Sequence, residues 1–275
     1  MAIEAPFHPQ EAYQCGPAAL AMALGWSGVA VTPDELAREV FVPGRKGSFA
    51  VGLVAAARAH GRVPVPVGDL RGILAELAAG HPVLVFQELG LRLPGLSAPH
   101  FAVAVGYDLG SQALELHSGA TPRRLTTFAN FERTWARAGA FAVVVLPPDV
   151  LPAQPDEARW LGAAAGLERA GRAADAETAY RTALARWPAS APAWLALGNA
   201  LLAQARLADA IDALRRATRL DPVSAPAWNN LAHALAERGE ADAALAAARR
   251  AVALGGPHEA TALRTLREIE TGLSN

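Results

Sequence analysis

The chain has 275 residues, 52% hydrophobic residues and a formal net charge of −1 at pH 7. This length is sufficient for two domains, and the composition is that of an ordinary folded protein. The chain has no basic run interleaved with aromatics, no apolar stretch of about 20 residues and no signal-peptide pattern, so we expect no nucleic-acid partner and no membrane span.

The first part of the chain, residues 1–147, mixes helical and strand-like patterns. Helices are predicted at 16–26, 33–40, 48–60, 69–79 and 127–138. Thr32, and either Thr126 or Thr127, are the predicted N-caps. Strands are predicted at 63–67, 82–88, 100–108, 113–117 and 140–146. Helices first and an antiparallel sheet afterwards predict an α+β domain.

The only cysteine, Cys15, precedes Gly16 and Pro17 at the start of the first predicted helix. Proline is favoured at a first helical position. Free backbone donors and the helix dipole at such a position favour a thiolate. The residues that follow, 18–24, are apolar on every side, which predicts a buried helix that holds the thiol rigidly. The alternative is that Cys15 is a small buried hydrophobe.

A thiolate nucleophile requires an imidazole partner. Apart from His100 and His117, the histidines have local explanations in capping or exposure. His100 opens a predicted strand, where alternation places it on one face with the small residues Ala102, Ala104 and Gly106. This small-residue face predicts that the alanine-rich helix packs against it and brings Cys15 to the imidazole.

Two sequence blocks carry a family resemblance. Cys-Gly-Pro-Ala-Ala-Leu-Ala-Met begins at Cys15, and Pro-His-Phe-Ala-Val-Ala-Val-Gly-Tyr-Asp places His100 some 85 residues later. Together they resemble the papain-like cysteine peptidases of bacteria that trim double-glycine leaders from bacteriocin precursors, and their stand-alone relatives. The resemblance covers roughly residues 5–147. It implies a papain-like fold, a peptide or protein substrate and no cofactor, with Cys15 as the nucleophile and His100 as general base and then acid.

The same resemblance implies that an upstream glutamine donates a hydrogen bond to the oxyanion. Gln10 is the candidate, and Gln14 is the immediate neighbour of the thiol. Such a donor, with the backbone N–H of Cys15, typically contributes about 3–4 kcal/mol. Gln14 and Gly16 are also candidate substrate-binding residues. Leu96 and Ser97 are further candidates because they lie in the apolar loop 89–99, which leads into the histidine strand.

Members of this family usually have a third catalytic residue, an Asp on the strand after the histidine strand, which orients the imidazole. This chain departs from that pattern. A tight turn at residues 108–111 would put residues 117–119 opposite His100, and no carboxylate stands there. Either His117 orients His100 as a neutral acceptor, or the dyad works alone, or activity is reduced or lost. Two facing histidines and one thiol have no further ligand at regular spacing, so we predict no metal site.

The composition changes at a proline-rich stretch, which predicts a linker at residues 148–158. Beyond it, Trp160, Trp194 and Trp228 are spaced by 34 residues, and small and closing residues follow the same period. This pattern resembles the tetratricopeptide repeat (TPR), a pair of antiparallel helices. We therefore expect an all-α solenoid of three repeats and a capping helix over residues 159–275.

The concave face of such a solenoid, formed by the first helix of each repeat, predicts a protein partner. Asn199 and Asn230 occupy columns in which carboxylate-binding TPR proteins hold asparagines, but Leu195 stands where those proteins use a lysine. Capture of a C-terminal carboxylate there is therefore not expected. The alternative is that both asparagines are solvated or pack between helices.

The sequence thus predicts a cysteine peptidase domain at 1–147 whose repeats dock a substrate or partner. Deamidation or acyl transfer would use the same dyad. Another alternative is a non-catalytic peptidase-like fold that binds peptides while the repeats recruit partners. In a third, the repeats are the whole function. We expect a periplasmic or membrane-attached protein of the bacterial envelope if an N-terminal signal was removed, and a cytoplasmic one otherwise.

Overall fold

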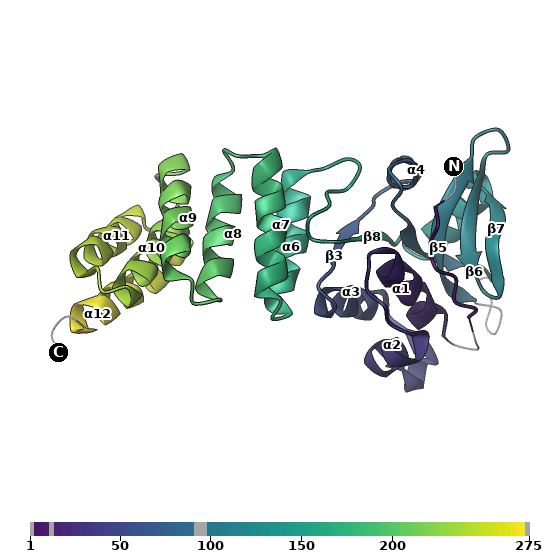
Figure 1. Ribbon diagram of the computed structural model, residues 1–275, viewed down its shortest axis with the longest axis horizontal. Coiled ribbons are helices and arrows are strands. Elements are labelled where there is room, and N and C mark those ends of the chain that lie inside the picture. The colour runs from purple at the N-terminus through teal and green to yellow at the C-terminus, as the bar shows by residue number, and fades with distance from the viewer. Residues whose placement is uncertain (1–2, 11–13, 91–97, 273–275) are drawn as a thin grey trace. The chain divides into compact units, whose positions relative to one another are not determined.

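The computed structural model describes residues 3–10, 14–90 and 98–272 (Figure 1). The chain forms two compact units, Met1–Arg172 and Ala173–Asn275. The first unit contains the predicted α+β region, the proline-rich stretch and the first helix after it. The domain limits at residues 147 and 159 stay a prediction.

The N-terminal unit has the predicted α+β architecture. Its helices are α1 (Cys15–Trp26), α2 (Pro33–Val40), α3 (Ala50–Ala59), α4 (Leu70–Ala78), α5 (Phe128–Arg137) and α6 (Glu157–Arg169), with a short 3-10 helix at Pro43–Arg45. Its strands are β1 (Phe41–Val42), β2 (Gly47–Ser48), β3 (Val63–Pro66), β4 (Val83–Glu88), β5 (Pro99–Asp108), β6 (Ala113–Ser118), β7 (Thr121–Thr127) and β8 (Ala142–Leu146). The predicted capping box at Thr32 and the cap at Thr127 are both confirmed.

Six strands form one antiparallel sheet in the order β3-β8-β4-β5-β6-β7, and β1 pairs with β2 separately. Three of these strands, β1, β2 and β7, were not expected from the sequence. The first two contain two residues each. Strand β7, with the sequence TPRRLTT, is an almost entirely exposed edge strand and therefore has no apolar alternation.

Helix α1 is the centre of the core, as its apolar sequence predicts. Residues 18–24 are at most 1% exposed, and they pack with α2, α3 and one face of the sheet (Figure 1). That face carries Phe101, Val103 and Val105 of β5. The expected packing of α1 on the small-residue face of β5 was therefore wrong. The alanine-rich surface of α1 leaves room for the larger side chains of the opposite face.

The other face of the sheet is covered by helices that follow later in the chain. Helix α4 packs on β5, and α5 packs on β4. The buried Gln87 of β4 donates from Nε2 to Thr134 Oγ1 of α5 at 2.7 Å, so its side chain lies on the α5 side. His100 is the cross-strand partner of Gln87 in the register. Directly opposed residues share a face, which places His100 on the face away from α1.

The second unit is a run of helices that pack in sequence order: α7 (Ala173–Arg186), α8 (Ala191–Leu202), α9 (Leu207–Leu220), α10 (Ala225–Glu237), α11 (Ala241–Leu254) and α12 (Glu259–Gly272). Gly198 of α8 packs so closely on α9 that a Cβ there would lie 2.6 Å from Leu214 Cγ. In two repeats the same hydrogen bond joins the tryptophan to a proline six residues earlier, which explains why both residues recur with the repeat. Trp194 Nε1 donates to Pro188 O at 3.0 Å, and Trp228 Nε1 donates to Pro222 O at the same distance. None of the described helices has the length and apolar character needed to cross a membrane.

Candidate active site

Cys15 is the first residue of α1 and has a free, partly buried thiol. The next residue, Gly16, is buried against β2. A Cβ at this position would lie 2.8 Å from Ser48 Cβ and 2.9 Å from Ser48 Oγ. The first turn of the helix is thus fixed by close packing, and glycine is required there for steric reasons. This packing explains Gly16 without substrate contact, and its predicted substrate role stays a prediction.

His100 is held by a serine of the neighbouring strand. Its Nε2 lies 2.8 Å from the Oγ of Ser118, the last residue of β6, and Ser118 is only 5% exposed. In the tautomer that leaves Nδ1 unprotonated, Nε2–H donates to this oxygen. Among the described residues, none hydrogen-bonds Nδ1, so this nitrogen is the one available to accept a proton.

The surroundings favour the neutral imidazole. Burial lowers the pKa of His100 below its ordinary value, and the positive charge of Arg124 on β7 lowers it further. A neutral imidazole at physiological pH is the form that serves as a general base. A buried neutral imidazole also opposes a permanent thiolate–imidazolium pair, because that pair requires His100 to be protonated.

His117 makes no hydrogen bond to His100, which counts against the alternative in which it orients that ring. It is 3% exposed, and its Nε2 lies 3.4 Å from Ala5 O, while its Nδ1 accepts from the backbone N–H of Arg123 at 3.2 Å. Both ring nitrogens are therefore engaged in tying the N-terminal segment to β6 and β7. The expected tight turn at 108–111 is wrong, because Asp108 pairs with Ala113. A β-bulge between Ala104 and Gly106 then shifts the strands by one residue, so that His117 pairs with Val103.

Gln10 closes the end of the sheet beside His100 and Ser118. Its Nε2 donates to Phe101 O at 3.1 Å, and its Oε1 accepts from the N–H of Gly119 at 2.9 Å. Its own N–H donates to Gly119 O at 3.0 Å. The residue continues the ladder between β5 and β6 where β6 ends. One amide hydrogen is committed to this ladder, which leaves one for the predicted oxyanion role.

Of the other predicted substrate residues, Gln14 is described by the structure. Gln14 is the N-cap residue of α1, and its Nε2 donates to Asp34 Oδ1 at 3.4 Å. Leu96 and Ser97 lie outside the described residues. No hydrogen bond joins Cys15 and His100 in the described part of the chain, so the structure brings His100 together with Ser118 and Gln10 but shows no bond to the thiol.

Sequence reasoning missed Ser118 and Arg124. A strict hairpin register places residues 117–119 opposite His100 and favours the histidine as its partner. The available signal was Gly106 inside the strand, since an isolated strand glycine often marks a bulge. Arg124 was missed because β7 has no strand pattern. Among the described residues, no group of three His, Cys, Asp or Glu side chains comes together as a metal site would require.

The predicted partner residues of the repeats contact one another. Asn230 Nδ2 of α10 donates to Asn199 Oδ1 of α8 at 2.7 Å, and Asn229 Nδ2 donates to Asn230 Oδ1 at 3.3 Å. This ladder matches the helix-packing alternative. Part of their hydrogen-bonding capacity is thus used within the repeats.

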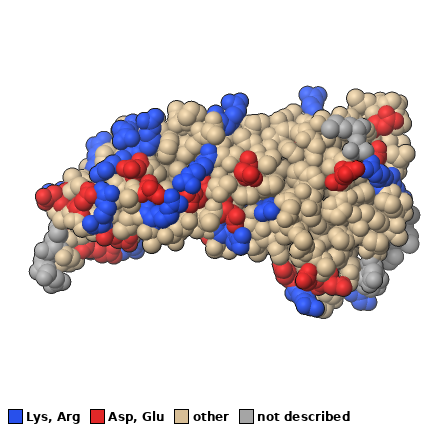
Figure 2. Space-filling view, viewed as in Figure 1, with Lys and Arg blue, Asp and Glu red and all other residues tan. Residues whose placement is uncertain are grey.

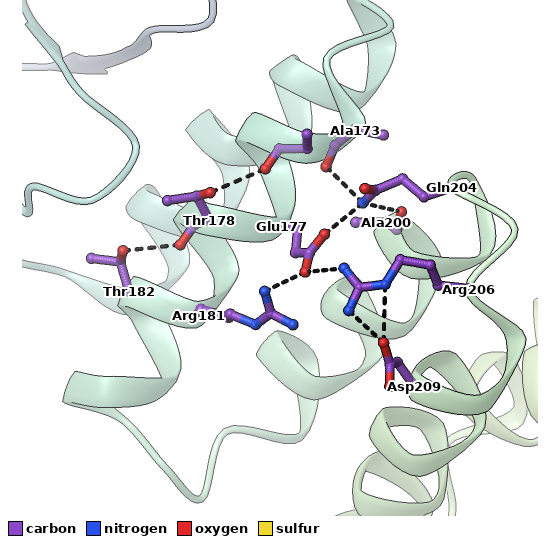
Figure 3. A network of polar contacts seen from close by, with 10 residues as sticks. Ala173, Glu177, Thr178, Arg181, Thr182, Ala200, Gln204, Arg206 and Asp209 are labelled. Carbon is purple, nitrogen blue, oxygen red and sulfur yellow. Dashed lines mark hydrogen bonds and ion pairs between the residues drawn. The ribbon is translucent and has the colours of Figure 1, made fainter.

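A second polar network joins α7, α8 and α9 (Figure 3). The carboxylate of Glu177, 4% exposed, accepts from Gln204 at 2.7 Å and from Arg206 at 2.7 Å, and it also pairs with Arg181. Burial alone would raise the pKa of Glu177, but these hydrogen bonds and the two arginine charges lower it overall. Arg206 also pairs with Asp209, so the network links consecutive repeats by satisfied charges.

Comparison with known proteins identifies two families. The model of the Peptidase_C39 like family matches residues 2–143, and that of the Tetratricopeptide repeat matches residues 161–225 and 195–259. No curated protein sequence matches the chain significantly. Among solved structures, a C39-like peptidase from Bacillus anthracis is 17% identical, over 53% of this chain and 96% of its own, with a TM-score of 0.42.

Two TPR structures match the C-terminal part of the chain. MamA is 25% identical over 43% of this chain and 69% of its own, with a TM-score of 0.40. The first TPR domain of Spaghetti, solved with an HSP90 peptide, is 17% identical over 43% of this chain and 94% of its own, with a TM-score of 0.41.

Proposed function

Because the chain belongs to the Peptidase_C39 like family and carries tetratricopeptide repeats, we propose that it is a cysteine peptidase whose repeats dock a protein. Cys15 is the nucleophile and His100 the general base. The observation that carries this proposal is the bond between His100 Nε2 and Ser118 Oγ, which fixes the ring and leaves Nδ1 free to accept the thiol proton.

The reaction follows the usual course of cysteine peptidases. The sulfur of Cys15 bonds to the scissile carbonyl carbon as its proton passes to His100. His100 then donates this proton to the departing amine, and the C–N bond breaks to leave a thioester. Water, deprotonated by His100, attacks the thioester and releases a carboxylic acid and the free thiol. The backbone N–H of Cys15 and the remaining amide hydrogen of Gln10 would donate to the oxyanion.

Three features favour the alternative of a non-catalytic peptide-binding domain. His100 has a serine where a triad carries a carboxylate, Gln10 is tied into the sheet, and α1 packs on the face of β5 away from His100. In this alternative the fold holds a peptide and the repeats recruit partners. Deamidation or acyl transfer by the same dyad would require the same reactive thiol.

The repeats supply the docking surface in either case. Figure 2 shows arginines and acidic residues intermixed over the C-terminal unit, so a partner would meet both signs of charge there. We propose that it binds the first helices of the repeats, α8 and α10, which carry Asn199 and Asn230. Replacing both asparagines by alanine should weaken capture of the partner without affecting the thiol.

The test is alkylation of the single cysteine by iodoacetamide between pH 5 and 9. A peptidase thiol should react much faster in the parent than in His100→Ala at every pH at which the imidazole is neutral and can accept the thiol proton. His258→Ala, which changes a histidine on a short 3-10 helix of the C-terminal unit, is the matched control and should behave as the parent. Equal, slow alkylation in all three proteins would exclude the dyad. Hydrolysis itself is then sought by mass spectrometry of peptide mixtures, and cleavage must disappear in Cys15→Ser.

A further inference from the structure

A pocket of about 550 Å³ lies within the N-terminal unit, between α3, β3, β8 and α6. Its wall is largely apolar and includes Val54, Pro64 and Phe141. Two arginines complete it, Arg58 from α3 and Arg159 from α6, and no acidic side chain is among the described residues that line it. The volume falls within the range of small-molecule sites.

Arg58 is a partly exposed cation in the wall of this pocket. Its Nε is shielded from solvent and makes no hydrogen bond, and no carboxylate of the described residues pairs with the guanidinium. Burial lowers the pKa of Arg58, and the positive charge of Arg169 lowers it further. The Nε–H has thus lost contact with solvent without gaining an acceptor, and the partly exposed guanidinium has no counterion among the described residues.

Close packing against α6 fixes the position of the Arg58 guanidinium in the wall of the pocket. A Cβ on Gly166 of α6 would lie 2.6 Å from Arg58 Cζ, so the guanidinium lies directly across the glycine. Arg159, Gly162, Ala163 and Gly166 follow helical spacing along one side of α6. Gly166 leaves the space that the Arg58 side chain occupies, and Arg159 lines the pocket together with Arg58.

We propose that this pocket binds the C-terminal carboxylate of a peptide whose last residue is apolar. A planar guanidinium pairs with a carboxylate through two parallel N–H···O bonds, and Arg159 adds a second positive charge. The apolar wall takes the side chain of the last residue. A bare phosphate would satisfy the arginines but leave this wall uncovered, so the composition of the pocket favours a carboxylate with an apolar body.

This site does not depend on catalysis by Cys15, and its test is separate from the alkylation test. The probe is acetyl-Leu-Phe with a free C-terminal carboxylate, compared with the same peptide as its C-terminal amide, by isothermal titration calorimetry on the full chain. We expect the acid to bind at least about tenfold more tightly than the amide, because a hydrogen-bonded charge pair is lost in the amide. Equal affinity for the two peptides, or no binding of either, would overturn the proposal.

Variants locate the site. Arg58→Met keeps the aliphatic stem and should reduce the affinity for the acid to that for the amide. Arg71→Met, an exposed arginine of α4 outside the pocket lining, should leave it unchanged. Gly166→Ala keeps every charge but displaces the guanidinium, and it should also weaken binding. This variant keeps the proposal testable if Arg58→Met does not fold.

The remaining outcomes are also decisive. Unchanged affinity in folded Arg58→Met would overturn the assignment of the pocket. Inorganic phosphate that competes with the acid peptide at equal affinity would identify a simple anion site and exclude the peptide C-terminus. The alkylation rate of Cys15 in Arg58→Met should equal that of the parent, which separates failure of this site from failure of the peptidase proposal.

Discussion

Ser118 is expected to act as a positioning residue for His100. Ser118→Ala removes the 2.8 Å bond to His100 Nε2 and leaves this partly buried ring nitrogen without its partner. A neutral hydrogen bond of this kind contributes about 1 kcal/mol, so we expect alkylation of Cys15 to slow roughly fivefold at pH 7. The measurement is unambiguous because Cys15 is the only thiol in the chain.

The pH profile separates an orienting role from a merely structural one. The lowered pKa of His100 keeps the imidazole neutral, and therefore competent as a base, at pH values below its ordinary 6.5. Ser118→Asp adds a carboxylate beside the ring, which should raise the pKa of His100 and move the acidic limb of the profile to higher pH. Ser111→Ala, which removes a hydroxyl bonded to Asp108 in a turn, is the control. A parent-like rate and profile in Ser118→Ala, alongside loss of reactivity in His100→Ala, would refute the positioning role.

Three further predictions concern the scaffold. Gly16→Ala places a Cβ 2.8 Å from Ser48 Cβ and should lower the free energy of unfolding by about 1–3 kcal/mol in urea titrations; a change below about 0.5 kcal/mol would contradict the close packing. Gly198→Ala should destabilise the repeats similarly, whereas Gly52→Ala, on a helix with open space around the site, should be neutral or stabilising by up to about 1 kcal/mol. Because the pKa of Glu177 is lowered, its carboxylate stabilises the folded repeats at pH values above the ordinary pKa of 4.5, and this stabilisation is lost as the pH falls through the lowered pKa. Glu177→Gln should abolish this acid-dependent loss of stability, measured by helical circular dichroism against pH.

The fold could be predicted where local signals and burial agree. Helix α1 is apolar on all sides and is fully buried, and the capping residues fixed the starts of α2 and α5. The repeats were visible through the 34-residue spacing of tryptophans, two of which donate to the carbonyl of a proline six residues earlier. Strand β7 could not be predicted because an exposed edge strand needs no apolar face, and its pairing with β6 is set by the turn that precedes it.

The site was harder to predict than the fold because it depends on register. A tight turn at 108–111 predicts residues 117–119 opposite His100, but the observed turn is longer, since Asp108 pairs with Ala113. A bulge at Ala104/Gly106 then decides which side chain shares a face with His100, because one residue of slip exchanges the faces of a strand. His117 and Ser118 are neighbours in sequence, yet the first bonds the N-terminal segment and the second bonds His100. The face that α1 covers was also decided by packing, since an alanine-rich helix fits large side chains as well as small ones. Peptide hydrolysis by this chain therefore requires that Nδ1 of His100 accept the proton of the Cys15 thiol. The alkylation profile measures that coupling directly.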